Sequence, residues 1–302
     1  MIPGLLEMKL EVPYPMTPAM DEPQRERHMA WSVSQGYPRI KYRAMTNQVM
    51  QIIAYGPSLE DTWRDINPEK PLLTMSGALR FLLERGLKPK WGRWFHVEVD
   101  PRPHKIKMLE RHEEVIYLIG SCAHPELFKY LEGTHVVLFH ARSGPHTKTW
   151  IERNDPGQVL VCAGSTVGLT AIHVGGVFGY RHFEIHGMDG SFRGDARHCG
   201  PHTGIVHGQR PSQLNPAYMT SRMMENTNFE IKVMLHNFPL FAIFHGDGVV
   251  QDWVGKANLP NAARAGSEHA RQVRASMFEE VSVDTARELY EAGVPLMNEA
   301  YA

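Results

Sequence analysis

Short apolar runs alternate with helix-like stretches along most of this chain, and the alternation constrains its fold more than any other feature. The runs cover residues 49–55, 71–75, 94–99, 115–119, 136–139, 158–162, 183–186 and 240–244. Apolar runs of about 4–7 residues separated by helical patterns of about 8–15 residues are typical of βαβ units and a parallel sheet. Because the runs are almost continuously apolar, both faces of that sheet should be covered. The sequence therefore predicts an α/β fold: a doubly wound, mostly parallel sheet with helices on both faces.

The two ends of the chain differ from this central pattern. Residues 1–47 carry many prolines and no sustained period, which predicts an irregular N-terminal extension. We expect one doubly wound α/β domain over 48–250. A C-terminal extension should follow over 251–302, with a helix near 284–292. Within the domain, we expect a loop of about 15 residues after 139, a His- and Gly-rich loop over 190–216 and a long helix over 218–236.

Composition excludes several classes of protein. Lys+Arg number 32 and Asp+Glu 33 in 302 residues, and this net charge of −1 argues against a general nucleic-acid binder. No apolar run approaches the roughly 20 residues that cross a bilayer, and no secretory signal pattern opens the chain, so we expect no membrane partner. The 3 cysteines do not form a disulfide framework, which indicates a reduced, cytoplasmic protein. The oligomeric state stays open.

Small and hydroxyl-bearing residues follow the predicted strands. In an open parallel sheet, ligands bind at the carboxyl ends of the strands, where backbone N–H groups and helix N-termini can hold phosphate. The residues in question are Gly56, Pro57 and Ser58; Ser76 and Gly77; Gly120 and Ser121; and Gly164, Ser165 and Thr166. Each loop alone is better explained by caps and turns, but several such loops at one sheet edge predict a phosphorylated ligand. The chain has neither GxxxxGK[ST] nor GxGxxG, which argues against a P-loop kinase and an NAD enzyme.

The third predicted strand carries an unusual row of ionisable residues. His96, Glu98 and Asp100 alternate along it and so share one face. Either this is an edge strand with a solvated face, or the row belongs to a site. Asp100 stands at the strand end beside Arg102 and Lys105, a grouping that suits Mg²⁺ plus phosphate.

Two further features could contribute to such a site. Asp189 follows another predicted strand and is a second carboxylate that could bind the Mg²⁺ ion or contact the acceptor. The alternative is that it only caps the Gly190 turn. In the His-rich loop, the spacing of Cys199 and its neighbouring histidines matches no established zinc pattern. His202 and His198 are therefore candidates for a general base or a phosphate contact, with backbone hydrogen bonding as the alternative.

Several segments in order resemble a known family. They are YGPSL (55–59), SGALRFLLERGLKP (76–89), HVEVDPRPHK (96–105), GSCAHPELF (120–128), AGSTVGLTAI (163–172), GMDGSF (187–192) and RHCGPH (197–202). Over roughly 49–250 the chain resembles the 6-hydroxymethylpterin diphosphokinase MptE-like family. The resemblance implies a Rossmann-like fold and Mg²⁺-dependent transfer of diphosphate from ATP to a pterin alcohol; bacterial relatives belong to flagellin and surface-glycan modification.

The Gly56-Pro57-Ser58 loop is also similar to the nucleotide loop of a bacterial sialyltransferase family that uses CMP-sugars. There the loop usually follows Gly-Asn, where this chain has Ala54 and Tyr55.

The resemblance also implies roles for single residues. Phosphate would be cradled by Gly56, Pro57 and Ser58, the nucleoside pocket lined by Ser76 and Gly77, and the donor or acceptor contacted by Gly164, Ser165 and Thr166. Asp100 would hold Mg²⁺ with Asp189 as the second candidate ligand. Independently of the resemblance, the position of Arg102 and Lys105 beside Asp100 predicts that they contact phosphate. Asp100, Asp189 and His202 are the candidate catalytic residues.

Three hypotheses on function follow. The first is a nucleotide-dependent transferase, in its most specific form one that moves diphosphate from a nucleoside triphosphate to a small hydroxyl acceptor with Mg²⁺. The second is a glycosyltransferase that uses a nucleotide sugar. The third is a binding module that keeps the nucleotide pocket without catalysis.

Overall fold

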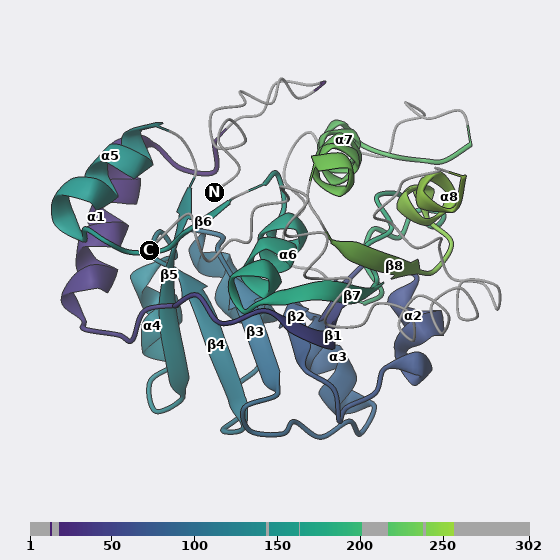
Figure 1. Ribbon diagram of the computed structural model, residues 1–302, viewed down its shortest axis with the longest axis horizontal. Helices are drawn as coiled ribbons and strands as arrows, with labels where there is room; N and C mark the ends of the chain where they lie inside the picture. The colour runs from purple at the N-terminus through teal and green to yellow at the C-terminus, as the bar shows by residue number, and fades with distance from the viewer. Residues whose placement is uncertain are drawn as a thin grey trace.

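The eight strands found among the described residues lie in one parallel sheet, in the order β6-β5-β4-β3-β2-β1-β7-β8 (Figure 1). The computed structural model describes Pro13 and residues 18–142, 145–162, 164–200, 217–237 and 240–256. The strands are β1 (Thr46–Ile53), β2 (Leu72–Met75), β3 (Trp94–Glu98), β4 (Val115–Gly120), β5 (His135–Arg142), β6 (Leu160–Cys162), β7 (Tyr180–His186) and β8 (Phe241–His245). The prediction of a Rossmann-like α/β fold with a parallel sheet is confirmed.

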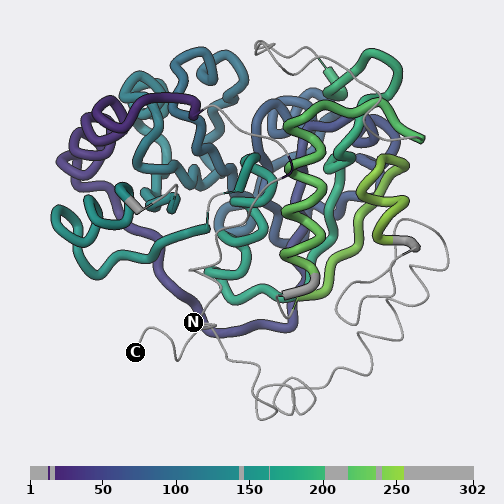
Figure 2. Tube along the Cα trace, turned by 90° about the horizontal axis from the view of Figure 1, so that it is seen from above, coloured from purple at the N-terminus to yellow at the C-terminus, as the bar shows by residue number. Residues whose placement is uncertain are grey.

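Helices cover both faces of the sheet. They are α1 (Glu22–Ser34), α2 (Leu59–Thr62), α3 (Ala78–Glu84), α4 (Pro125–Tyr130), α5 (Pro145–Asn154), α6 (Val167–Val177), α7 (Arg222–Asn237) and α8 (Val249–Lys256), with short 3₁₀ turns at Trp63–Asp65 and Pro103–Met108. Seen from above, α1 and α5 lie together at one end of the molecule and α7 and α8 at the other (Figure 2).

Alternate side chains of the strands feed two separate apolar cores. Met50 and Ile52 of β1 pack in one core with residues of α6, α7 and α8, whereas Ile53 packs in the other with residues of α3 and α4. Since successive strand residues point to opposite faces, a strand buried on both sides is mostly apolar. This explains the continuous apolar runs of the sequence.

The chain reverses its direction of travel across the sheet at β1. From β1 it proceeds through β2 to β6 on one side, and it then crosses to β7 and β8 on the other side of β1. β1 pairs with both β2 and β7, and Ile53 lies opposite His186 at the carboxyl ends of β1 and β7. The topological switch point, where ligands of such sheets bind, is therefore between the loops after β1 and β7.

The N-terminal 47 residues contain more structure than the proline pattern predicts. Helix α1 begins after Asp21, whose carboxylate accepts a hydrogen bond from the Gln24 N–H at 2.7 Å. Proline is tolerated in a first helical turn because the N–H it lacks has no helical partner there. The chain then runs beside β5, where Leu138 N–H donates to Pro38 O at 2.7 Å and Ile40 N–H to Leu138 O at 2.9 Å. The expectation of an irregular extension is thus wrong for 22–34.

Two other expectations need correction. Helix α5 lies inside the segment expected to be a loop after 139. Strand β3 is interior, between β2 and β4, and His96 and Glu98 are fully buried, so the edge-strand alternative is wrong. The long helix expected over 218–236 is found as α7. The helix expected near 284–292 lies outside the described residues. In the part of the chain that is described, no helix has the length and apolar character needed to cross a membrane.

Candidate functional site

Ser58 and Asp189 join the loops that follow β1 and β7 at the switch point. The Ser58 backbone N–H donates to Asp189 Oδ2 at 2.9 Å, and the Ser58 hydroxyl donates to Asp189 Oδ1. The Gly56 N–H donates to Gly187 O at 2.8 Å. Both Ser58 and Asp189 are buried. We call Gly56, Ser58, Gly187 and Asp189 the switch-point corner.

The switch-point corner needs glycine at position 56 because the two loops approach so closely. A Cβ on Gly56 would lie 2.4 Å from Gly187 O and 2.6 Å from Asp189 Oδ2, which no side chain tolerates without movement. The N–H groups of Gly56 and Ser58 are both engaged with protein acceptors, and Pro57 has none. The cradle predicted for phosphate at Gly56, Pro57 and Ser58 is therefore occupied by the β7 loop in this structure.

Asp189 is held by neutral donors only. Besides Ser58, the Gln251 amide on α8 donates to Asp189 Oδ1 at 3.3 Å. Burial raises the pKa of Asp189, against the hydrogen bonds from Ser58, which act to lower it; the nearby Asp247 charge raises it further. A carboxyl group with a raised pKa at a switch point is a functional candidate as well as a structural link.

Asp100, at the carboxyl end of β3, is held by cations instead. The Arg102 guanidinium donates to Asp100 through Nε at 2.8 Å and through a second nitrogen, and Lys105 Nζ lies 3.6 Å from Asp100 Oδ2. Burial acts to raise the pKa of Asp100, but the hydrogen bonds and charges of Arg102 and Lys105 outweigh it and hold this pKa below its usual value. Asp100 is therefore an ionised carboxylate that orients two cations.

Glu98, at the end of β3, lies next to this group. Its Oε1 accepts from the backbone N–H groups of Val99 and Asp100 at 2.8 and 2.9 Å, and burial raises the pKa of Glu98. Its other oxygen is buried with no hydrogen-bond partner among the described residues. Asp100, rather than Glu98, is the carboxylate paired directly with Arg102 and Lys105.

A third cation, missed by the sequence analysis, lies in the same region. Burial and, to a lesser degree, the charge of Arg102 lower the pKa of Arg197 to about 10, so Arg197 lies within electrostatic range of Arg102. The one hydrogen bond of the Arg197 side chain within the described residues goes to Met223 Sδ at 3.5 Å, and no carboxylate pairs with it there. Arg102, Lys105 and Arg197, which we call the cation cluster, thus outnumber the negative charge around them. Arg197 directly precedes the candidate His198 in the sequence, and this basic residue beside a predicted phosphate contact was the signal that could have identified it.

Tyr55, in the loop after β1, contacts both the segment 197–200 and the turn after β2. The Tyr55 carbonyl lies 3.1 Å from the Cys199 N–H, which donates to it, and 3.2 Å from His198 Nδ1. The Tyr55 ring stacks on His198 with centroids 5.7 Å apart, and it leaves no space for a Cβ at Gly77 or Gly200. Tyr55 therefore ties the loop after β1, the turn after β2 and the segment 197–200 together.

Ser76 forms that turn after β2 in a strained conformation. Its φ of 50° makes it the one non-glycine residue with positive φ among those described. Such a backbone costs a residue with a side chain roughly 1–2 kcal/mol and is found preferentially at functional sites. The placement of Ser76 next to Gly77 and Tyr55 agrees with the predicted nucleoside pocket, which stays a prediction.

The loop after β6 is bound to α7. The Ser165 N–H donates to Glu230 Oε2 at 2.9 Å, and the hydroxyls of Ser165 and Thr227 lie 2.8 Å apart. A Cβ on Gly164 would contact Leu169 at 2.4 Å, and Thr166 precedes α6 as its N-cap residue without a side-chain cap bond. The contact of Gly164, Ser165 and Thr166 with a donor or acceptor stays a prediction.

The predicted site residues therefore form three groups along the carboxyl edge of the sheet: Ser58 with Asp189, Asp100 with Arg102 and Lys105, and Ser165 with α7. No hydrogen bond or ion pair joins one group to another within the described residues. His202 lies outside the described part of the chain.

The carboxylates do not fit a resident Mg²⁺ ion in this arrangement. Both oxygens of Asp189 and both of Asp100 accept hydrogen bonds from protein groups. Among the residues described, no three His, Cys, Asp or Glu side chains gather as metal ligands would. Since Mg²⁺ is commonly bound through substrate phosphates with few protein ligands, an ion carried by a nucleotide remains compatible with the site.

Fold and site together define a Rossmann-like α/β protein with a cation cluster beside its switch point. Residues 35–195 match the family described as 6-hydroxymethylpterin diphosphokinase MptE-like, and the chain belongs to this family. The resemblance found in the sequence is thereby confirmed, and family membership supports a transferase-type function.

A solved structure with the same fold comes from a larger protein. The MAf glycosyltransferase from Magnetospirillum magneticum AMB-1 aligns with a TM-score of 0.57 and 15% sequence identity, over 85% of this chain and 42% of that one. The chain thus spans less than half the length of that protein. No curated protein matches the sequence.

Proposed function

We propose that this protein is a nucleotide-dependent transferase that binds the phosphates of its donor at the cation cluster. The observation that carries the proposal is Arg197, a partly buried guanidinium within electrostatic range of Arg102 that has no carboxylate partner among the described residues. Burying like charges together is costly unless an anion joins them. Arginine pairs are suited to phosphate because each guanidinium offers two parallel N–H donors.

The chain's own residues would then act as follows. Arg102 and Arg197 bind the phosphates, while Asp100 holds Arg102 and Lys105 in place as a positioning residue. Tyr55, which stacks on His198 next to Arg197, and Ser76 and Gly77 would line the nucleoside pocket. Cations fixed in this way offset the charge that develops on the transferred group and on the leaving phosphate.

Within this class, the leading reaction is the transfer of diphosphate from a nucleoside triphosphate to a small hydroxyl acceptor. Family membership supports it, and Mg²⁺ carried on the nucleotide would supply further neutralisation of phosphate charge. In this reaction the roles predicted for Asp189 and His202 in moving the proton of the acceptor hydroxyl stay predictions.

A second candidate is glycosyl transfer from a nucleotide sugar. It is favoured by the fold shared with the MAf glycosyltransferase and by the engagement of both candidate carboxylates with protein donors. The two candidates share the phosphate-binding cluster and differ in the nucleotide and in their need for Mg²⁺.

Ligand-induced thermal stabilisation of the whole chain tests the proposal. ATP, GTP, CTP, CMP and UDP at millimolar concentration are compared with and without Mg²⁺, because a ligand that binds only the native state must raise the melting temperature. A shift with a triphosphate that requires Mg²⁺ supports diphosphate transfer. A shift with CMP or UDP that does not require Mg²⁺ supports glycosyl transfer. Absence of any shift contradicts the proposal.

Two matched variants then locate the site. Arg197→Met should weaken binding of the active nucleotide at least tenfold, since a charge-assisted hydrogen bond contributes about 1.5–3 kcal/mol. Arg181→Met is the control. Arg181 is also partly buried, but it lies at the amino end of β7, opposite the carboxyl edge of the sheet, and it donates to Gly176 O and Tyr180 O. Equal losses in both variants would refute the assignment of the cation cluster. Binding without turnover of any acceptor would indicate a catalytically silent module.

A further inference from the structure

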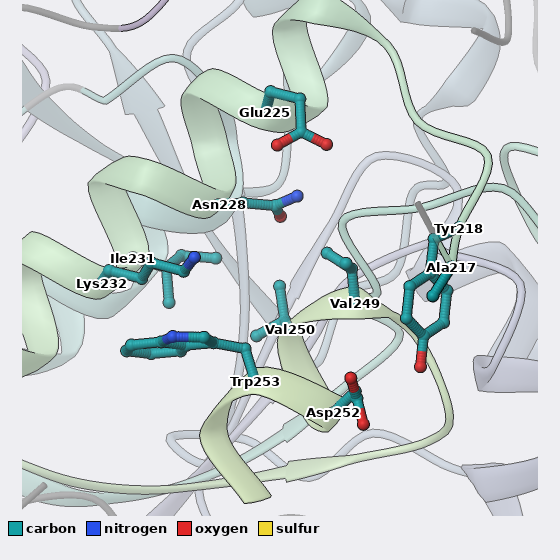
Figure 3. Close-up of a pocket in the computed structure, with 10 residues that line it drawn as sticks. All are labelled: Ala217, Tyr218, Glu225, Asn228, Ile231, Lys232, Val249, Val250, Asp252 and Trp253. Atoms are coloured by element: carbon teal, nitrogen blue, oxygen red, sulfur yellow. The ribbon is translucent and has the colours of Figure 1, made fainter. Parts of the chain in front are cut away.

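A cavity of about 170 Å³ lies between α7 and α8, and no residue of the cation cluster lines it (Figure 3). A water molecule occupies about 30 Å³ in the liquid, so the space is sized for a small organic molecule. None of the site residues predicted from the sequence lines it.

The cavity adjoins the turn that carries Asp189. Asn228 of α7, in the cavity wall, donates from its amide nitrogen to Gly190 O at 3.1 Å. From the α8 side, the Val250 N–H donates to Asp189 O at 3.1 Å. The wall of the cavity is thus built directly on the residues next to the switch-point corner.

Two acceptor atoms in this wall have no donor. Asn228 is 5% exposed, and its Oδ1 is buried without a hydrogen-bond partner within the described residues. The bond to Gly190 O fixes which end of the amide is the oxygen. Glu225 Oε1, one turn earlier on α7, is likewise buried and unpartnered there. Figure 3 shows both side chains extending from α7 toward α8. Because buried polar atoms in proteins are normally paired, these oxygens indicate a ligand that brings donors.

The rest of the lining restricts what that ligand can be. Asp252 places a further carboxylate on the α8 side, and Val249 and Val250 form an apolar wall between the acceptors (Figure 3). Lys232 is the cation of the lining, with its Nζ 4.9 Å from the centre of the Trp253 ring, and the carboxylates of Glu225 and Asp252 outnumber it, which disfavours an anion. An ammonium group has three N–H donors but offers no apolar surface to the valines, whereas a ring bearing several hydroxyls donates to acceptors on different sides and leaves its C–H groups against the valines.

We infer that the cavity between α7 and α8 binds a small polyhydroxylated ring, with hydroxyl groups that donate to Asn228 Oδ1 and Glu225. This inference rests on the proposed function, in which a hydroxyl compound bound beside Asp189 is the acceptor. The position of the cavity next to the Asp189 turn agrees with that role.

The test uses the full chain and saturation-transfer NMR with D-glucose and myo-inositol at tens of millimolar, without nucleotide. Both should show transfer, and Glu225→Ala should weaken binding at least tenfold without lowering the melting temperature. The melting temperature should change little because Glu225 Oε1 has no hydrogen-bond partner in the described structure. Glu230→Ala, on the same helix, is the control: it loses the bond from Ser165 and should lower the melting temperature while polyol binding persists.

The outcomes separate the two proposals. No transfer to either polyol, or binding that Glu225→Ala leaves unchanged, overturns the cavity assignment even if nucleotides bind. Transfer to ethanolamine in place of the polyols overturns the class of ligand. Polyol binding that responds to Glu225→Ala, in a protein that no nucleotide stabilises, keeps the cavity assignment and refutes the nucleotide proposal.

Discussion

Two carboxylates stand at equivalent places in the fold, after β7 and after β3, and they have opposite surroundings. Asp189 is buried among neutral donors, Ser58 and Gln251, and burial raises its pKa. Asp100 faces Arg102 and Lys105, which together outweigh burial and lower its pKa. One corner of the sheet edge is thus a hydrogen-bonded joint between loops, and the other is a charged cluster with cations in excess. The comparison teaches that position at a strand end does not fix the role of a carboxylate; its partners do.

The joint should fail most severely when a side chain is forced between its loops. Gly56→Ala puts a methyl group against the Gly187 carbonyl and the Asp189 carboxylate, so we expect it to lower the free energy of unfolding by about 3 kcal/mol or more. Gly92→Ala is the control, because a Cβ there has open space and pays only for its positive φ, roughly 1 kcal/mol. Urea denaturation of both variants measures the difference. Equal costs would mean that the loops are not tightly joined.

The opposite pKa directions predict opposite pH dependence for the two corners. The pKa of Asp100 is lower in the folded protein than in the unfolded chain, where it is near 3.8. Ionised Asp100 therefore stabilises the fold when the pH is above 3.8, and this stabilisation is lost as the pH falls through the pKa of the folded protein. The raised pKa of Asp189 contributes stability below its unfolded value, also near 3.8, and that contribution is lost as the pH rises through the folded value.

Replacing each carboxylate with its amide isolates these contributions. Asp189→Asn should lower the free energy of unfolding by about 2 kcal/mol, because the amide nitrogen would face a donor of Ser58. The variant should also no longer lose stability when the pH is raised above about 4. Asp100→Asn should instead remove part of the loss on acidification. Free energies of unfolding measured from acid to neutral pH check both slopes. The same slope change in the two variants would abolish the contrast drawn above.

The smallest effect is expected at the rim of the joint. Arg193 lies 2.6 Å from carboxylate oxygens of both Asp61 and Asp247, but its side chain is 41% exposed. Exposed ion pairs contribute little, so Arg193→Ala should cost less than about 1 kcal/mol, and the cost should shrink in high salt. A larger loss of stability in thermal denaturation that does not depend on salt would show that ion pairs stabilise the switch-point corner, as they do the group around Asp100.

Much of the fold could be predicted because its cause is local. Strand β4 is almost entirely buried on both faces, so it had to be a nearly uninterrupted apolar run, visible without any neighbour. The errors have physical reasons too. The prolines before α1 concealed a helix that Asp21 caps, and a charged row on β3 looked like an edge because the sequence does not show that its neighbours bury it.

Part of the candidate site could also be anticipated. Asp100 with Arg102 and Lys105 was expected as a group, since the three are close in the chain. The pairing of Ser58 with Asp189 spans 131 positions, and Arg197 comes within electrostatic range of Arg102 from a distant loop, so neither interaction leaves a trace in local pattern.

The sequence by itself determined that this protein folds as a parallel α/β sheet with small and polar residues at its carboxyl edge, because strand burial and turn chemistry depend on neighbouring residues. Only the tertiary structure decided which of those polar groups are already satisfied. The N–H groups of Gly56 and Ser58 are bonded across the switch point, whereas Arg197 and Asn228 keep unmatched charge or acceptors within the described structure. Whether a polar group is free for a ligand depends on partners brought together from distant parts of the chain, and only folding brings them together.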